Sequence, residues 1–302
     1  MNRTGKTISA FLAILLVTCV LYSQESVKKD QDPVKTVSVD VDVVLIPTTV
    51  TNDRGQYVGG LEKENFVVFE DRVQQDVTYF STEDSPMSLG IVLDSSGSMN
   101  QITAAARRNG GACMNAGTTE DEYFLIVFSD KLKVNTDFTT DLRALRAELL
   151  SVNSKGSTAL YDAIYAGLAK LRDGINPRKA LVVVSDGYDN HSRYSGKNVR
   201  EAVRETDVQL YLIGNEGDGA LRSLAESTGG RSLSSRSRTF ELGTICNEIV
   251  RNLKNQYLIG YHSSNASKDG KWRNVQVKLN APEGIKLNVR SRTGYYAPED
   301  KN

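Results

Sequence analysis

The spacing of apolar residues changes twice along the chain and divides it into three parts. From residue 37 to residue 84, apolar and polar residues alternate, as in "TVSVDVDVVLI", which predicts half-buried strands around the turn signal "NDRG". The segments "NFVVFED" and "QDVTYFS" read as further short strands. From 86 to 254, longer apolar runs alternate with helical patterns, and from 255 to 298 short strand patterns return. We therefore predict three folded segments with these bounds.

The central segment is predicted to be an α/β domain. Four apolar runs, "LGIVLD", "YFLIVFSD", "ALVVVSDG" and "VQLYLIG", read as strands. Helical spacing occurs in "NQITAAARRNGGACMNA", "DLRALRAELLS", "TALYDAIYAGLAKLRD", "GKNVREAVRET" and "FELGTICNEIVRNLK". This alternation predicts a doubly wound, mainly parallel sheet with helices on both faces.

The two outer segments are too short to fold well alone. The first has about 50 residues with no helical pattern, and a chain of that size buries little surface. We predict that the segments 37–84 and 255–298 pair into one small β-sandwich, with the α/β domain inserted between its strands.

The N-terminus has the pattern of a secretory signal peptide. Arg3 and Lys6 precede the apolar stretch "ISAFLAILLVTCVLY", which is short for a bilayer span, and a polar stretch follows. We predict a signal peptide over 1–23, a linker over 24–36, and a secreted or periplasmic protein. A lipoprotein signal at Cys19 is less favoured, because Thr18 stands where a smaller residue is expected, and membrane attachment is expected only with that lipid.

Charge and cysteine usage narrow the classes of partner. The chain has 37 basic and 37 acidic side chains, so its formal net charge is zero and nothing indicates nucleic-acid binding. It contains three cysteines without a C-x-x-C pair, and its two histidines, His191 and His262, are far apart in sequence. Zinc-ligand spacing is therefore absent.

Three polar clusters are expected at the carboxyl edge of the predicted sheet, the second of them just before a helical pattern. They are Asp94-Ser95-Ser96-Gly97-Ser98, the stretch "NSKGSTAL" with Thr158, and "VVVSDGYDN" with Asp186. Ligands of open α/β sheets gather at the carboxyl ends of the strands. Two carboxylates and three hydroxyls, without sulfur or imidazole, favour Mg²⁺, with Mn²⁺ or Ca²⁺ as alternatives. The candidate ligands are Asp94, Ser96 and Ser98 in the first cluster, Ser157 or Thr158 in the second and Asp186 in the third. Their low negative charge favours a further acidic oxygen from another molecule.

Other motifs fit these residues less well. An EF-hand that starts at Asp94 would need a glutamate where Ala105 stands, and in "KGST" the lysine precedes the glycine, unlike a phosphate-binding loop. The glycines of a nucleophile elbow are missing, and no histidine is near Ser96 in sequence. Helix capping, by Ser98 or Asn100 and by Thr158, remains an alternative for each residue taken singly. Asp189 and Asn190, beside the third loop, are interpreted as a solvated turn, with a role in specificity as the alternative.

These residues resemble the von Willebrand factor type A (VWFA) domain with its metal-ion-dependent adhesion site. Its D-x-S-x-S motif matches Asp94, Ser96 and Ser98, its threonine matches Thr158, and its last aspartate matches Asp186. The flanking segments "VTNDRGQYVGGLEKENFVVFED" and "YLIGYHSS…GYYAP" resemble a secreted acidobacterial VWFA-related subgroup.

The resemblance implies a role for each ligand. Ser96 and Ser98 would bind the ion directly, Thr158 would do so when ligand is present, and Asp94 and Asp186 would act largely through water. A Glu or Asp of a partner protein would fill the sixth position. The family places its first and last helices side by side, so Cys113 and Cys246 either form a disulfide or are two unpaired buried thiols.

The expected function is that of a secreted, metal-dependent module for adhesion or protein binding, and not of an enzyme. One alternative is a metal-dependent hydrolase, for which the sequence offers no general base near the site. Another is a structural scaffold of an envelope complex.

Overall fold

The computed structural model describes residues 43–82, 84–100, 103–104, 117–134, 137–153, 155–214, 219–234, 241–280 and 286–299. The chain divides into two compact units, Met1–Val41 and Asp42–Asn302, and all described residues belong to the second. The predicted signal peptide, the linker, residues 37–42 and most of the predicted helix over 100–116, with Cys113, lie outside them. Among the described residues, no helix combines the length and apolarity needed to cross a bilayer.

A mostly parallel sheet forms the centre of the α/β part. Its strand order is β10-β9-β8-β5-β6-β7, and all neighbours are parallel except β7, which pairs antiparallel with β6. The predicted mainly parallel sheet is thereby confirmed. The strands are β5 (Met87–Asp94), β6 (Glu122–Phe128), β7 (Leu132–Val134), β8 (Arg178–Val184), β9 (Gln209–Gly214) and β10 (Arg231–Ser234).

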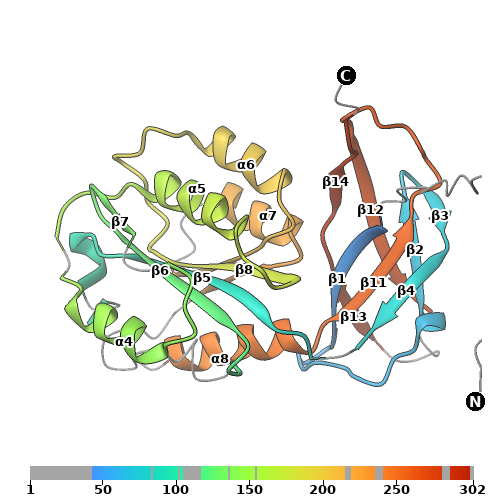
Figure 1. Cartoon of the computed structure of the whole chain (residues 1–302), viewed down its shortest axis with the longest axis horizontal. Coiled ribbons are helices and arrows are strands. Elements are labelled where there is room, and N and C mark those ends of the chain that lie inside the picture. Colours follow the sequence, from blue (N-terminus) through green and yellow to red (C-terminus); the bar gives the residue numbers. More distant parts are fainter. Residues whose placement is uncertain are drawn as a thin grey trace, which may run out of the picture. The chain divides into compact units, whose positions relative to one another are not determined.

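Helices cover both faces of this sheet, as Figure 1 shows, with α5, α6 and α7 on one face and α4 and α8 on the other. Alternate residues of β5 therefore enter two separate cores. Ile91 belongs to the same apolar cluster as Ile249 of α8, whereas Val92 belongs to that of Ile164 of α5. The helices are α4 (Leu142–Ser151), α5 (Leu160–Leu171), α6 (Gly196–Arg204), α7 (Gly219–Ser227) and α8 (Glu241–Lys254).

Two glycines allow α5 to pack closely on the sheet. A Cβ atom on Gly90 of β5 would clash with the ring of Phe124 and would lie 2.7 Å from Leu181 Cδ1. A Cβ atom on Gly167 of α5 would also lie 2.7 Å from Leu181 Cδ1. Because neither position has room for a side chain, α5 lies directly on β5 and β8. At its other end, α5 begins at Leu160, close to Thr158 of the predicted site.

The remaining strands form two four-stranded sheets, with orders β13-β1-β11-β4 and β14-β12-β2-β3. Each sheet contains strands from before and after the α/β part. One apolar cluster joins them, with Ile46 and Ile259 from the first sheet and Val68 and Val277 from the second. The strands are β1 (Val43–Asn52), β2 (Phe66–Glu70), β3 (Val73–Gln75), β4 (Val77–Ser81), β11 (Tyr257–His262), β12 (Trp272–Leu279), β13 (Leu287–Arg290) and β14 (Gly294–Tyr296).

Some elements differ from the sequence-based expectations. The pattern "QDVTYFS" predicts one strand, but the chain changes sheets at Asp76, between β3 and β4. The buried Gln75 holds this change of direction, since its side chain accepts a hydrogen bond from Ser264 N and donates one to Ser264 Oγ, both at 2.9 Å. The short edge strands β7 and β10 and the helix α7 are not among the predicted elements.

Candidate functional site

The first predicted ligands lie in the loop that follows β5. Asp94 is fully buried at the end of the strand, and its Oδ1 accepts a hydrogen bond of 2.8 Å from Ser96 N. The hydroxyl oxygens of Ser96 and Ser98 are 3.2 Å apart. Ser96 is buried, whereas Ser98 is exposed. The loop therefore gathers a carboxylate and two hydroxyls between the sheet and the solvent.

The environment of the buried Asp94 carboxylate includes a second carboxylate. Burial raises the pKa of Asp94, hydrogen bonds from Ser96 and Ser185 oppose that rise, and the negative charge of Asp186 adds to it. Asp186 is itself 7% exposed. A cation near both carboxylates would offset their repulsion and the cost of burying Asp94, so the donor set fits a hard divalent ion.

The second loop is held against the first by its backbone. Lys155 N donates a hydrogen bond of 2.8 Å to Ser95 O, and Gly97 N donates one of 3.4 Å to Gly156 O. Gly156 has φ +100°, a left-handed conformation that glycine adopts without strain. These bonds place the loop that carries Thr158 beside the loop that carries Asp94.

Helix capping does not account for Thr158. The N-cap residue of α5 is Ala159 and not Thr158, and the side chain of Ala159 makes no capping hydrogen bond. Ser96 is the N-cap of the short 3₁₀ helix η2 (Gly97–Met99), again without a side-chain cap bond. The capping interpretation of Thr158 is therefore wrong, and Thr158 is buried.

The third loop is tied to the first by Ser185, a residue outside the predicted set. Ser185 Oγ donates a hydrogen bond of 2.7 Å to Asp94 Oδ2 and accepts one of 3.1 Å from Gly187 N. Asp186 Oδ1 accepts a bond of 3.3 Å from Tyr188 N. The one sequence signal for Ser185 is its position between a buried strand and a predicted ligand.

The second and third loops also contact each other directly. Thr158 N donates a hydrogen bond of 2.8 Å to Asn190 Oδ1, and Thr158 O accepts bonds of 3.0 Å from Asn190 N and His191 N. Asn190 is exposed in a bend, in line with a solvated turn, and its side chain also accepts a hydrogen bond from Thr158 N. The backbone of His191 also lies beside Thr158, although the sequence separates the two.

All five predicted ligands thus lie on three loops that hydrogen bonds join into one cluster. Their coordination of an ion stays a prediction. Within the described ranges, no three side chains of His, Cys, Asp or Glu gather as a potential metal site. The predicted site is of a different kind, because three of its five ligands are hydroxyls.

One of the two cysteines considered for a disulfide lies among the described residues. Cys246 is buried in α8 and is disulfide-bonded. Cys113 lies outside the described residues, so the pairing of these two cysteines stays a prediction.

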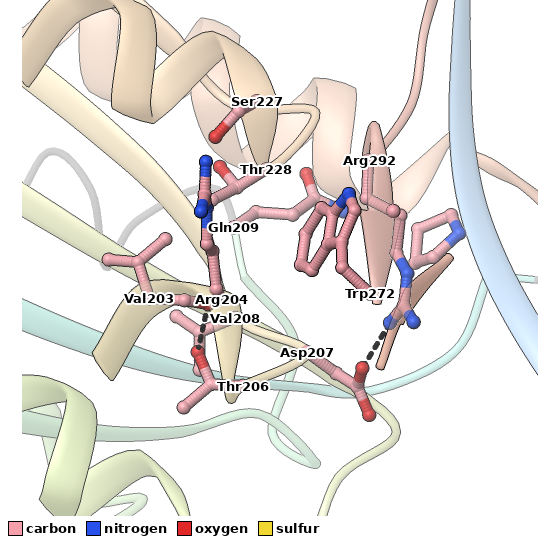
Figure 2. A pocket seen from close by; sticks show the side chains of 12 residues that line it. Val203, Arg204, Thr206, Asp207, Val208, Gln209, Ser227, Thr228, Trp272 and Arg292 are labelled. Atoms are coloured by element: carbon pink, nitrogen blue, oxygen red, sulfur yellow. Dashed lines mark hydrogen bonds and ion pairs between the residues drawn. The ribbon is translucent and has the colours of Figure 1, made fainter. Parts of the chain in front are cut away.

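A small pocket lies apart from the five predicted ligands, between the α6–β9 region and strands β12 and β14 (Figure 2). The guanidinium of Arg204 lies 5.2 Å from the centre of the Trp272 ring, and Arg292 forms an ion pair with Asp207. The hydroxyl of Thr206, another lining residue, donates to a nearby backbone carbonyl. Because these side chains already have partners in the chain, we assign the pocket a structural role.

Comparisons with known proteins bear on the α/β part. A profile of the von Willebrand factor type A domain matches residues 89–188. A search of curated proteins finds no match.

Several solved structures are similar to this chain. A von Willebrand factor type A protein from Catenulispora acidiphila is 12% identical, covering 87% of this chain and 76% of that chain, with a TM-score of 0.49. BatB from Bacteroides thetaiotaomicron is 17% identical, covering 55% and 97%, with a TM-score of 0.46. The vWF domain of the type V pili tip protein Mfa5 from Porphyromonas gingivalis is 11% identical, covering 56% and 95%, with a TM-score of 0.44. The profile match supports a von Willebrand factor type A domain in the α/β part of this chain.

Proposed function

We propose that this chain binds a divalent cation at a metal-ion-dependent adhesion site and uses it to hold a protein partner. The ion is Mg²⁺, or Mn²⁺ or Ca²⁺ in its place. The ligands are Asp94, Ser96, Ser98, Thr158 and Asp186. The observation that carries the proposal is the joining of three loops at the carboxyl edge of the sheet, above all by the bond from Ser185 to Asp94.

The charge of the ligands indicates the chemistry of the partner. Two carboxylates and three neutral hydroxyls satisfy a divalent ion only in part, so a bound ion supplies an attractive position for another carboxylate. A Glu or Asp side chain of a partner protein fits that position. Ser98, which is exposed, marks the side from which the partner approaches.

We extend the proposal to the rest of the chain. Residues 37–84 and 255–298 form one β-sandwich around the inserted domain 86–254, which the shared apolar cluster of the two outer sheets supports. Residues 1–23 direct the protein to the periplasm or the outside of the cell, as in the acidobacterial subgroup that the flanking segments resemble. The module acts by binding and not by catalysis.

Isothermal titration with MgCl₂ and MnCl₂ tests the metal site. Asp94→Ala removes a buried carboxylate of the site, and we expect it to weaken binding at least about tenfold, as losses around metal sites commonly do. Asp173→Ala is the matched control, because Asp173 is exposed just beyond the far end of α5. Equal affinities of Asp94→Ala and wild type would overturn the proposal. A pull-down with and without chelator then addresses the partner.

A further inference from the structure

The first turn of α5 is capped by the third loop and not by the residue before the helix. Its N-cap, Ala159, has no side chain that can accept a hydrogen bond. Instead, Tyr161 N donates a bond of 3.3 Å to Asp189 Oδ1, and Asp162 N donates one of 3.1 Å to Ser192 Oγ. Ser192 Oγ in turn donates a bond of 2.5 Å to Asp189 Oδ1. These N–H groups of the helix end are thus satisfied from a distant part of the sequence.

In turn, a side chain of α5 accepts hydrogen bonds from backbone N–H groups of the same loop. Asp162, the third residue of α5, is buried, and its Oδ1 accepts bonds of 2.9 Å from both Arg193 N and Tyr194 N. Its Oδ2 pairs with Arg193 Nε at 3.3 Å. The start of α5 and this loop thus cap each other, as the two residues of a capping box do within a single helix.

Thr158 lies at the centre of these contacts. Its N–H and its carbonyl both bond to the same loop, through Asn190 and His191. The loop begins shortly after Asp186, with only Gly187 and Tyr188 between them, so its position ties one predicted ligand to another.

We propose that residues 189–194, here called the capping loop, position Thr158 relative to Asp186, with Asp189 as a positioning residue that does not contact the ion. This inference rests on the proposed function and extends it. It predicts that cation affinity depends on a hydrogen-bond acceptor at position 189. If Asp189 had a purely local structural role, cation affinity would not depend on it. If its charge mattered, cation affinity would fall even when an uncharged acceptor replaced the carboxylate.

A pair of substitutions separates these roles. Asp189→Ala removes the acceptor for Tyr161 N and Ser192 Oγ, whereas Asp189→Asn keeps an acceptor oxygen and removes the charge. We expect Asp189→Ala to weaken Mg²⁺ binding about tenfold, the lower end for losses of supporting hydrogen bonds. In metal-free protein it should also speed amide hydrogen exchange at Thr158 and Tyr161. Asp189→Asn should resemble wild type in both measurements.

Two results would overturn the inference. One is equal loss of Mg²⁺ affinity in Asp189→Asn and Asp189→Ala, which would assign the effect to charge. The other is unchanged exchange at Thr158 in Asp189→Ala. Asp173→Ala is again the control, and circular dichroism verifies that each variant is folded. If wild type binds no Mg²⁺, the proposed function fails, and the exchange in metal-free protein still decides whether the loop positions Thr158.

Discussion

At the scale of single residues, Ser185 links two of the loops that carry the predicted ligands. Its hydroxyl donates to the fully buried carboxylate of Asp94 and accepts from Gly187 N in the next loop. A buried carboxylate that loses a donor keeps its desolvation cost without that compensation. Ser185 should therefore contribute to stability even without a metal ion.

Ser185→Ala is expected to lower the free energy of unfolding by about 1–3 kcal/mol, the usual cost of an unsatisfied buried polar group. Urea unfolding in metal-free buffer measures it. Ser151→Ala is the control, because Ser151 is exposed and its hydroxyl bonds only to Glu148 O among the described residues, at 2.7 Å. Equal effects of the two substitutions would contradict the role assigned to Ser185.

The sequence predicts the candidate ligands but not the residues that position them. Asp94 and Asp186 stand out because they end apolar runs, and that signal is local. Ser185, Asp162 and Asn190 act through partners about 30 to 90 positions away, as in the bonds from Ser185 to Asp94 and from Thr158 to Asn190. Only the folded chain brings such pairs together.

At the scale of elements, the end of α8 is fixed by a buried arginine. Arg178, the first residue of β8, donates hydrogen bonds to Leu253 O at 2.9 Å, Lys254 O at 2.6 Å and Gln256 O at 3.2 Å. A cation at this position also favours the negative end of the helix dipole. Lys254 adds an ion pair of 3.1 Å with the buried Asp121. The passage from α8 into β11 is thereby held to the sheet.

Arg178→Met is expected to lower the free energy of unfolding by about 2–4 kcal/mol, since carbonyl groups that were bonded to a buried charge lose their donors. Arg172→Met is the matched control, because Arg172 is exposed and pairs with an exposed Glu205. Chemical denaturation of both variants measures the difference. A loss in Arg178→Met no larger than in the control would show that the passage does not depend on this residue.

Elements are predicted well where burial gives a long apolar run. All residues of β5 and β6 are buried, and their patterns are unambiguous. The edge strands β7 and β10 have three and four residues, too few to show a period. At the break between β3 and β4, the side chain of Gln75 bonds to Ser264, a contact that no periodicity reveals.

At the scale of the whole molecule, the outer sheets and the α/β part contact each other through polar groups. Gln256 Nε2 donates bonds to Thr49 Oγ1 of β1 at 3.0 Å and to Gln209 Oε1 of β9 at 2.9 Å. Thr293 N donates one of 2.9 Å to Ser227 O at the end of α7. None of these contacts involves the five predicted ligands, so the proposed partner site is confined to the three loops.

The central claim is that the three loops bind a divalent cation. The most direct test is X-ray diffraction from crystals of the protein grown with MnCl₂, with anomalous data collected near the manganese absorption edge. We predict an anomalous peak among the three loops, about 2.1 Å from the hydroxyl oxygens of Ser96 and Ser98, close to the distance at which oxygen binds such ions. Crystals that diffract well and show no peak there, or a peak only elsewhere on the chain, would contradict it.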